Sequence, residues 1–306
     1  MIRRQLDFTG QIAIVTGAGQ GLGRSHALLL AARGAKLLVN DPGPALDGTG
    51  GSTTAAEEVV AEIRAAGGEA YANFDSVATN EGAKAIIEAA IAQFGRVDIL
   101  ICNAGIRISQ PIVDVDDEAW RRTMAVHLDG TLFTTRAAWP YMLSQNYGRV
   151  VFTASSVGLY GKGGVISYGT AKAGVFGIMK SLADEIGESD IRVNTLLPGA
   201  ITRMAPPETR TLWEVNPGLH EPELVSSLVA YLASRNCVAN GRAYSAGGGF
   251  FARDEVMQSQ GVRFDYREGI SPEQIADQWE KINDMTDANC FETAMKYGAN
   301  MFGISK

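Results

Sequence analysis

Apolar positions along the chain follow two alternating spacings. Short runs rich in valine, isoleucine and leucine are separated by longer stretches in which apolar residues recur every three or four positions. The short runs predict strands, the longer stretches predict helices, and repeated units of this kind form a parallel sheet with helices on both faces. The expected fold class is α/β, with a doubly wound sheet of seven parallel strands. The predicted strands are Ile12–Thr16, Lys36–Asn40, Ala70–Phe74, Val97–Cys102, Arg149–Thr153, Arg192–Leu197 and Arg242–Ser245.

The strand pattern ends well before the chain does. We expect residues 1–249 to form a single Rossmann-type domain that binds the cofactor and carries catalysis, and residues 250–306 to be a C-terminal extension. The extension is expected to pack on this domain or on a dimer partner. Within it, a helical pattern from Pro272 to Met285 follows Ser271, a residue type that favours the N-cap.

Two irregular stretches interrupt the alternation. Asp41–Thr54 is rich in glycine and proline, but it is too short to separate domains and predicts an enlarged loop. Met204–Pro222 is rich in proline and lies where sheets of this kind carry a substrate loop, so we expect a lid there. Trp213 within this second loop is a candidate for the wall of an apolar substrate pocket.

Composition narrows the class of protein. With 46% hydrophobic residues the chain of 306 can bury a large core, and its net charge of −7 disfavours nucleic acid and anionic membranes as partners. No apolar stretch approaches the roughly 20 residues of a membrane span. The Arg3-Arg4 start runs into Asp7 rather than into a signal-peptide core. The three cysteines are too scattered for a disulfide framework, so a cytoplasmic protein is expected.

The acidic run Asp116-Asp117-Glu118 raises the question of a metal site. Acidic residues are favoured at the positive end of a helix, and a helical pattern follows this run, so a helix start explains it. His26 and His220 have no partners at metal-ligand spacing, and positions on a helix surface and in a loop explain them. We therefore predict no metal site.

A glycine-rich turn follows the first predicted strand and precedes a predicted helix. Missing side chains let a ligand approach closely, and the free amides at a helix start bind phosphate oxygens. A plain structural turn is the alternative, but the strand-loop-helix context favours the pyrophosphate of a dinucleotide. The predicted cofactor contacts in this turn are Gly17, Gln20, Gly21, Leu22 and Gly23.

Asp41 ends the second predicted strand, about 20 residues after the glycine turn. A carboxylate there accepts hydrogen bonds from the adenosine ribose of NAD and repels the 2′-phosphate of NADP. Arg24 is the nearest basic residue, but it lies inside the helix, where a solvated position explains it. We therefore expect NAD as the cofactor.

Ser155, Tyr168 and Lys172 form the candidate catalytic centre. Tyr168 and Lys172 are four residues apart in a predicted helix, so the phenol and the ammonium share one face. Such a pair alone is more often surface packing, but Ser155, just after a predicted strand, makes the combination rarer. A free phenol has a pKa near 10, and a nearby cation lets it exchange a proton with an alcohol at neutral pH. Ser155 would hold the substrate oxygen while hydride passes to the nicotinamide.

These motifs, TGxxxGxG from Thr16, Asn103-Ala104-Gly105 and the Ser155, Tyr168 and Lys172 set, together resemble the short-chain dehydrogenase/reductase family. The match spans the whole predicted sheet. The resemblance implies further cofactor contacts: Asp75 and Ser76 at the adenine, Asn103 and Gly105 near the ribose, Pro198, Ile201 and Thr202 around the carboxamide, and Tyr168 and Lys172 at the nicotinamide ribose.

Longer stretches carry a closer resemblance: VNDPG with its glycine-rich insert, EEVVAEIRAAGGEAYANFDSV, VHLDGTLFTTRAAW, YGRVVFTASSVGLYG and SPEQIADQWEKI. They are similar to the (3R)-hydroxyacyl-CoA dehydrogenase domain of peroxisomal multifunctional enzyme type 2, also called 17β-hydroxysteroid dehydrogenase type 4. This resemblance implies NAD, a fatty or steroid-derived acyl-CoA and a homodimer, with a homotetramer as the alternative. The hydratase and sterol-carrier sequences of that enzyme are absent and the chain ends without the leucine of SKL, so a stand-alone bacterial enzyme is expected.

One position departs from the wider family, in which an asparagine completes a catalytic tetrad. This chain has His127 there, as the closer relatives do. The histidine would either hold a backbone carbonyl and a relay water, as asparagine does, or titrate within the proton relay. The alternative is that His127 only packs between helices and has no catalytic role.

The leading functional hypothesis is NAD-dependent oxidation of a (3R)-3-hydroxyacyl-CoA to its 3-ketoacyl-CoA in fatty-acid or steroid side-chain breakdown. A 17β-hydroxysteroid dehydrogenase is the alternative among enzymes, because an apolar pocket discriminates only weakly between hydrocarbon shapes. A non-catalytic, NAD-binding partner subunit is the alternative from another class. The intact Ser155, Tyr168 and Lys172 set argues against it.

Overall fold

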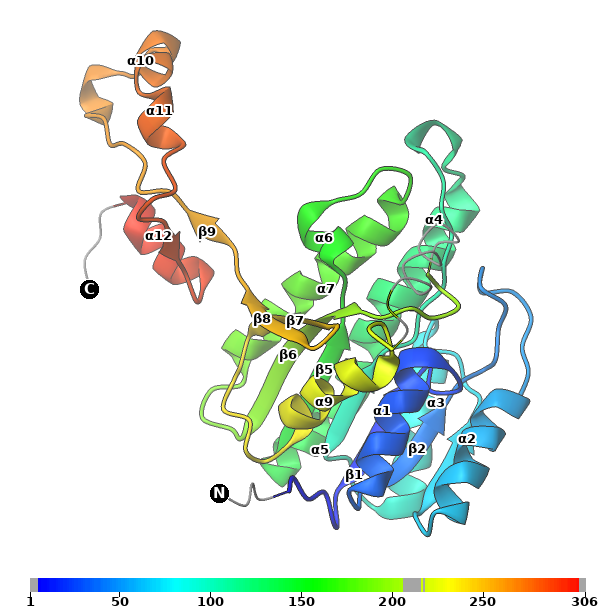
Figure 1. Ribbon diagram of the computed structural model, residues 1–306. Helices are drawn as coiled ribbons and strands as arrows, with labels where there is room; N and C mark the ends of the chain where they lie inside the picture. The colour runs from blue at the N-terminus through cyan, green and yellow to red at the C-terminus, as the bar shows by residue number, and fades with distance from the viewer. Residues whose placement is uncertain (1–4, 206–215, 217, 303–306) are drawn as a thin grey trace. The chain divides into compact units, whose positions relative to one another are not determined.

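The computed structural model describes residues 5–205, 216 and 218–302. The chain divides into two compact units, Met1–Arg253 and Asp254–Lys306. The first unit is built on one sheet with the strand order β3-β2-β1-β4-β5-β6-β7-β8 (Figure 1). Each described pairing from β3 to β7 is parallel, and the order reverses between β1 and β4, as in a doubly wound Rossmann-type sheet.

All seven predicted strands are present, with ends that differ from the predictions by no more than two residues. An eighth strand was not predicted. It follows β7 after the two-residue turn Gly248-Gly249, and so short a connection joins antiparallel strands. The sheet therefore continues past Gly249. The strands are β1 Ile12–Thr16, β2 Lys36–Asn40, β3 Ala70–Asn73, β4 Ile99–Cys102, β5 Gly148–Thr153, β6 Ile191–Gly199, β7 Arg242–Gly247 and β8 Phe250–Asp254.

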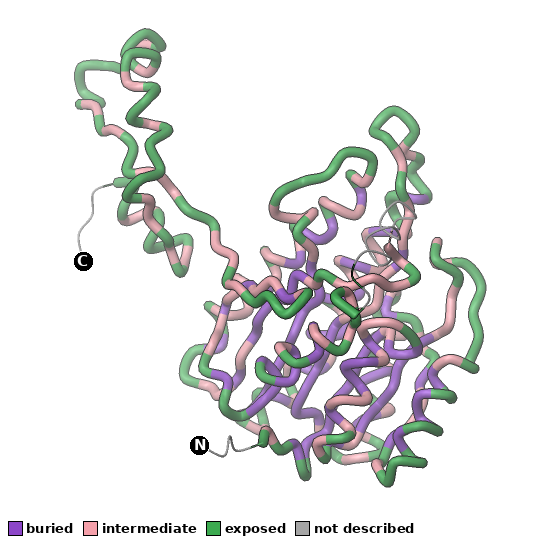
Figure 2. The backbone as a smooth tube through the Cα atoms, in the orientation of Figure 1, coloured by how far each residue is buried: buried purple, intermediate pink, exposed green. Residues whose placement is uncertain are grey.

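Helices cover both faces of the sheet, and its strands β1, β2, β4, β5 and β6 are buried along most of their length (Figure 2). One apolar cluster joins the sheet to α1 Gly21–Ala32, α2 Thr54–Ala65 and α9 Pro222–Ala233. A second joins the other face to α3 Asn80–Phe94, α5 Gly130–Gln145 and α7 Ile166–Glu185. Among the described residues, no helix has both the length and the apolar character to cross a membrane.

A long helical segment beside the carboxyl end of β4 changes its winding along its length. It begins as α4 Asp117–Met124, passes through a π-helical turn, η2 Ala125–Asp129, and continues as α5. Asp116 is the N-cap of α4 and accepts a hydrogen bond from the amide of Ala119 at 2.7 Å, as expected for an acidic helix start. Short helical turns, η1 Ile112–Asp114 and α6 Ser156–Tyr160, lie in the loops after β4 and β5.

The second unit holds short elements. They are β9 Met257–Gln258 paired antiparallel with β10 Asn289–Cys290, η4 Tyr266–Glu268, α10 Pro272–Asp277, α11 Trp279–Ile282 and α12 Ala294–Phe302. Ser271 caps α10 through a capping box with Gln274, as the sequence predicts at this start. The prediction of one helix from Pro272 to Met285 is wrong, because the helix ends at Asp277 and Gln278 has a non-helical backbone. No residue of α10 or α11 is buried, so packing does not stabilise one continuous helix.

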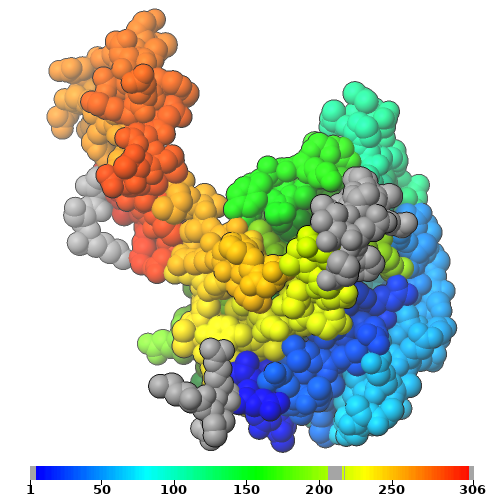
Figure 3. All heavy atoms as spheres, in the orientation of Figure 1, coloured from blue at the N-terminus to red at the C-terminus, as the bar shows by residue number. Residues whose placement is uncertain are grey.

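His26 corrects a second prediction, because it does not lie on a helix surface. Helices α1 and α9 lie side by side on one face of the sheet (Figures 1 and 3), and His26 is buried between them with 1% of its surface exposed. Its Nδ1 lies 2.7 Å from Ser226 Oγ, which also lies 2.7 Å from Ser25 Oγ. Burial lowers the pKa of His26 to about 3, so the imidazole is neutral in the folded protein.

Replacing His26 by asparagine should make the free energy of unfolding depend less on pH below about pH 6.5. In the unfolded chain a histidine takes up a proton below about pH 6.5, whereas the folded protein holds His26 neutral down to about pH 3. The free energy of unfolding therefore falls as pH drops through this window, by up to about 1.4 kcal/mol per pH unit from this group. Urea unfolding at pH 7, 6 and 5 should show a shallower decline for His26→Asn.

Equal slopes for His26→Asn and the wild type would show that His26 is not held neutral.

Candidate active site

The glycine turn between β1 and α1 is folded so tightly that side chains would not fit. Gly17 and Gly21 have φ values of +63° and +54°, in the left-handed region that favours glycine. A Cβ on Gly23 would lie 2.2 Å from the carbonyl oxygen of Gly17 and 2.5 Å from Asn103 Nδ2. The first turn of α1 therefore packs directly against the end of β1.

The start of α1 offers hydrogen-bond donors to a ligand. Its N-cap, Gln20, makes no side-chain capping hydrogen bond, and no acidic residue lies in the first turn. The first amides of a helix have no partner within the helix, and the helix dipole adds partial positive charge there. This arrangement fits the pyrophosphate of a dinucleotide.

Asn103 fastens the glycine turn to the end of β4. Its Nδ2 donates to the carbonyl oxygens of Thr16 at 3.0 Å and Gly17 at 3.1 Å. In return, Thr16 Oγ1 accepts from the amides of Asn103 at 3.0 Å and Ala104 at 3.1 Å. The side chain of Asn103 thus fixes the shape of the glycine turn. This structural role is additional to the ribose contact that the family resemblance implies for Asn103.

Asp41 lies at the end of β2 with 7% of its surface exposed. Its Oδ2 accepts a hydrogen bond from the amide of Gly19 at 2.8 Å, and its Oδ1 accepts one from the amide of Gly43 at 2.7 Å. The carboxylate therefore joins the glycine turn to the loop that follows β2. Among the described residues, no basic side chain is hydrogen-bonded or ion-paired to this carboxylate.

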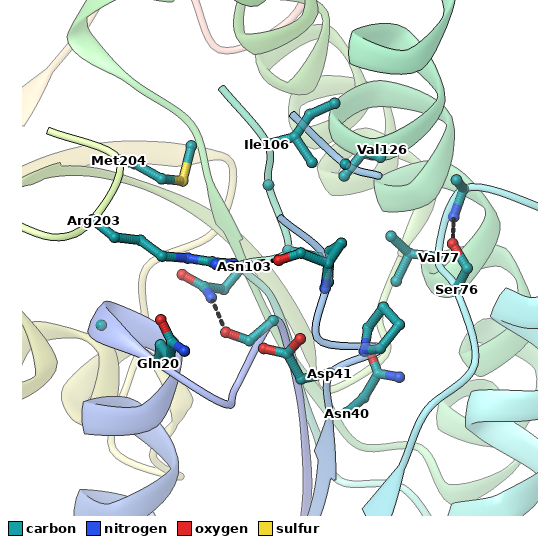
Figure 4. A pocket seen from close by; sticks show the side chains of 18 of the residues that line it. Gln20, Asn40, Asp41, Ser76, Val77, Asn103, Ile106, Val126, Arg203 and Met204 are labelled. Atoms are coloured by element: carbon teal, nitrogen blue, oxygen red, sulfur yellow. Dashed lines mark hydrogen bonds between the residues drawn. The ribbon is translucent and has the colours of Figure 1, made fainter. Parts of the chain in front are cut away.

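A cavity of about 310 Å³ lies over the carboxyl ends of β1, β2 and β4 (Figure 4). Its position at the reversal of strand order is where sheets of this type bind ligands. Nine of the predicted cofactor residues line it: Gly17, Gln20, Gly21, Leu22, Asp41, Ser76, Asn103, Gly105 and Thr202.

Other predicted cofactor residues do not line this cavity. Asp75 is turned toward its neighbours, since its Oδ2 accepts from Asn73 Nδ2 at 2.8 Å and its carbonyl oxygen from Asn40 Nδ2 at 2.8 Å. Gly23 acts through the packing of the turn. Pro198 lies in β6, and Ile201 donates its amide to the carbonyl oxygen of His220 at 3.0 Å. Much of the predicted lid at 204–222, with Trp213, lies outside the described residues.

The three candidate catalytic residues come together at the carboxyl end of β5. Ser155 is the N-cap of α6, and its hydroxyl is hydrogen-bonded to that of Tyr168 on α7. Lys172 follows one turn later and is 4% exposed. Its ammonium donates to the carbonyl oxygen of Thr153 and lies 5.8 Å from the centre of the Tyr168 ring.

Burial sets the charges in this centre. It raises the pKa of the Tyr168 phenol, against the smaller lowering by the hydrogen bond from Ser155. It also lowers the pKa of Lys172 to about 7. The phenol is therefore protonated at neutral pH, and any added positive charge beside it favours the phenolate.

His127 connects the cavity to this centre. Its ring meets the Tyr168 ring edge to face, with centroids 5.2 Å apart, and a Cβ on Gly105 would lie 2.7 Å from its Cε1. The Nε2 atom lies 2.8 Å from the carbonyl oxygen of Ile106, and Nδ1 is buried with no partner among the described residues. Burial and the nearby Lys172 lower the pKa of His127 to about 3, which argues against a titrating role.

Sequence reasoning missed three features of the site. The π-helical turn that carries His127 leaves no periodicity signal over so few residues. Arg122 and Arg203 line the cavity, but neither belongs to a motif in the sequence. The loop after β2 also lines it, through Pro42, Pro44, Gly48 and Gly50. Its glycine and proline content is the one signal that marked it.

A family model described as short chain dehydrogenase matches residues 11–212. The chain belongs to this short-chain dehydrogenase family. Members are oxidoreductases that act on CH–OH groups and use NAD or NADP, so a nicotinamide dinucleotide is the class of cofactor that the cavity must fit.

Relatives include a putative short-chain type dehydrogenase/reductase of Mycobacterium tuberculosis, 42% identical over 91% of this chain and 96% of its own. Peroxisomal multifunctional enzyme type 2 of Drosophila melanogaster is 40% identical over 93% of this chain and 47% of its own. The solved structure of that full-length enzyme has a TM-score of 0.80 at 32% identity, covering 98% of this chain and 50% of the other. The chain thus spans about half of that multifunctional relative.

Replacing Gly23 by alanine should displace the glycine turn from the start of α1 and weaken cofactor binding. The new methyl group would clash with the Gly17 carbonyl at 2.2 Å, so the start of α1 must move away from β1. Overpacking of this kind destabilises a protein by about 1 to 3 kcal/mol. We expect a lower urea midpoint and a loss of NADH affinity by roughly tenfold or more, measured by NADH fluorescence titration.

The matched control is Gly177→Ala, because Gly177 lies in α7 with no atom within 4 Å of a Cβ placed there. That variant should bind NADH as the wild type does and be slightly more stable. Equal NADH affinity in the Gly23→Ala variant would contradict the assignment of this turn to the cofactor.

Proposed function

We propose that the chain is an NAD-dependent dehydrogenase that oxidises (3R)-3-hydroxyacyl-CoA to 3-ketoacyl-CoA. One observation carries the dehydrogenase chemistry. Tyr168, Ser155 and Lys172 meet at the carboxyl end of β5, and His127 links them to a cavity whose opposite wall is a glycine turn at a helix start. A dinucleotide laid along that cavity extends from Asp41 toward Tyr168.

Each residue of the centre has a physical task in this proposal. Ser155 donates a hydrogen bond to the substrate oxygen, and Tyr168 takes the hydroxyl proton as the alcohol becomes a ketone. Lys172, held against the carbonyl oxygen of Thr153, stabilises the phenolate and contacts the nicotinamide ribose. A nicotinamide dinucleotide, when bound in the cavity, would supply the acceptor for the hydride of the carbinol carbon.

His127 acts in place of the family's asparagine as a positioning residue. Nε2 lies 2.8 Å from the carbonyl oxygen of Ile106 and 3.1 Å from its amide nitrogen, and in the proposed tautomer it donates to the carbonyl, so the imidazole holds the loop after β4 beside the cavity. Its buried Nδ1 is then an acceptor without a protein partner among the described residues, which suits a water molecule in the relay from Tyr168 and Lys172.

The substrate class is supported by the relatives. Their names include peroxisomal multifunctional enzyme type 2, peroxisomal hydratase-dehydrogenase-epimerase and 3-oxoacyl-[acyl-carrier-protein] reductase, and the last acts on a 3-oxo thioester by name. The hydroxyacyl-CoA assignment follows the sequence resemblance described above. We extend the proposal to a homodimer in the cytoplasm, on the basis of the sequence resemblance and the chain's composition.

The variant Tyr168→Phe tests the chemistry. Removing the phenolic oxygen removes the proton acceptor but leaves the ring against His127, so turnover of (3R)-3-hydroxyacyl-CoA should fall at least about 100-fold. NADH binding, followed by fluorescence, should change little. Undiminished turnover would exclude the phenol as the base, and a wild type that binds NADH but turns over no alcohol would favour a non-catalytic subunit.

The variant Asp41→Asn tests the choice of NAD. The amide keeps an oxygen for the Gly19 or Gly43 amide but loses the charge that repels a 2′-phosphate. We expect the ratio of kcat/KM for NAD over NADP to fall by roughly tenfold or more, since one unit of charge close to a phosphate contributes more than about 1 kcal/mol. An unchanged ratio would show that Asp41 does not select the cofactor.

A further inference from the structure

The loop of residues 42–52, here called the flap, is held by its own hydrogen bonds. The amide of Ser52 donates to the carbonyl oxygen of Pro42 at 2.9 Å, and that of Ala45 donates to the carbonyl oxygen of Thr49 at 2.8 Å. Gly43 has a φ of +65°, and a Cβ there would lie 2.0 Å from the carbonyl oxygen of Ser52. The base of the flap is therefore closed by a contact that only glycine permits.

Two hydrogen bonds join the flap to two other loops at the cavity, and a third joins those two loops to each other. Arg203 Nη1 donates to the carbonyl oxygen of Pro44 at 3.1 Å, and the amide of Arg107 donates to that of Leu46 at 2.7 Å. Arg107 Nη1 also donates to the carbonyl oxygen of Met204 at 3.2 Å. The flap, the loop after β4 and the loop after β6 thus form a closed ring of contacts.

The flap is also a wall of the cavity. Pro42, Pro44, Gly48 and Gly50 line it, and Gly48 packs against the side chain of Ile106. In the close view, Arg203 extends into the cavity beside Asn103, with Ile106 and Val126 on a neighbouring wall (Figure 4).

We propose that the flap is a latch over the adenosine half of the cofactor, and that Arg203 is a positioning residue that sets how fast the cofactor leaves. This inference rests on the proposed dinucleotide site. Asp41, at the base of the flap, marks the adenosine end, and a dinucleotide under the flap can leave only after the ring of contacts opens. Breaking the Arg203 contact should therefore speed release without touching the catalytic centre.

Release of NADH, measured by stopped-flow displacement with excess NAD, tests the latch. A single net hydrogen bond corresponds to a change of roughly fivefold, so Arg203→Ala should raise the dissociation rate about that much. Arg203→Lys keeps a cationic donor and should restore part of the slow release. ADP-ribose, which lacks the nicotinamide, should also dissociate faster from Arg203→Ala, because the flap covers the adenosine half.

Arg203→Ala also removes a positive charge, which by itself would speed the release of a ligand that carries a pyrophosphate. A second variant therefore changes the flap without removing a charge. Gly48 has a φ of +88°, and a Cβ there would lie 3.1 Å from Ile106 Cγ2, so Gly48→Ala should strain the flap away from the loop after β4. It should release both ligands faster as well. The control Arg121→Ala removes the same charge from an exposed position paired with Asp117 on α4 and should release them at the wild-type rate.

The outcomes separate the two proposals. Faster release from Gly48→Ala and Arg203→Ala, with Arg121→Ala unchanged, supports the latch. Wild-type rates in both flap variants, once circular dichroism shows them folded, would overturn the latch and leave the dinucleotide site standing. A wild type that binds neither NADH nor ADP-ribose would overturn both.

Discussion

The bond network between Thr16 and Asn103 is the constraint on which the rest of the site depends. It joins the ends of β1 and β4, the neighbouring strands between which the strand order reverses. Because the Thr16 hydroxyl and the Asn103 amide satisfy the backbone groups at both strand ends, the glycine turn can close on α1 with a gap too small for a methyl group. The cavity, the flap and the group of Ser155, Tyr168 and Lys172 are all placed relative to this junction.

Burial is the second organising force, and it acts on charge. Lys172, Tyr168 and His127 are packed together beside the cavity. Desolvation lowers the pKa of Lys172 and His127 and raises that of Tyr168, and each shift favours the neutral form of the side chain. The Tyr168 phenol and the His127 imidazole are therefore neutral at neutral pH, whereas Lys172, with a pKa of about 7, is about half protonated. A positive charge placed beside the phenol would favour its phenolate form, so in the proposed reaction proton transfer to Tyr168 depends on what occupies the neighbouring cavity.

The features that could be predicted from the sequence are those with a periodic or motif signal. The seven parallel strands, the glycine turn, and the spacing of Ser155, Tyr168 and Lys172 all depend on local pattern, and the structure brings each group together. Strand β8 escaped prediction because Phe250 and Phe251 are exposed, so no burial pattern marks it. The extension helix was over-extended because its apolar spacing has no packing partner within the described residues to keep Gln278 helical.

Other features depend on contacts between segments far apart in the chain. His26 is buried only because α9 brings Ser226 to it, about 200 residues later. The flap is a cavity wall only because Arg107 and Arg203 reach it from two other loops. No local pattern encodes such meetings, which is why the sequence showed an enlarged loop and the structure shows what the loop covers.

The most direct test of the account is the initial rate of NADH formation by the purified protein with NAD, comparing (3R)- and (3S)-3-hydroxyacyl-CoA of equal chain length and a 17β-hydroxysteroid. The account predicts rapid NADH formation with the (3R) epimer and none above background with the (3S) epimer. Equal rates with the two epimers, or activity with the free steroid alone, would contradict it.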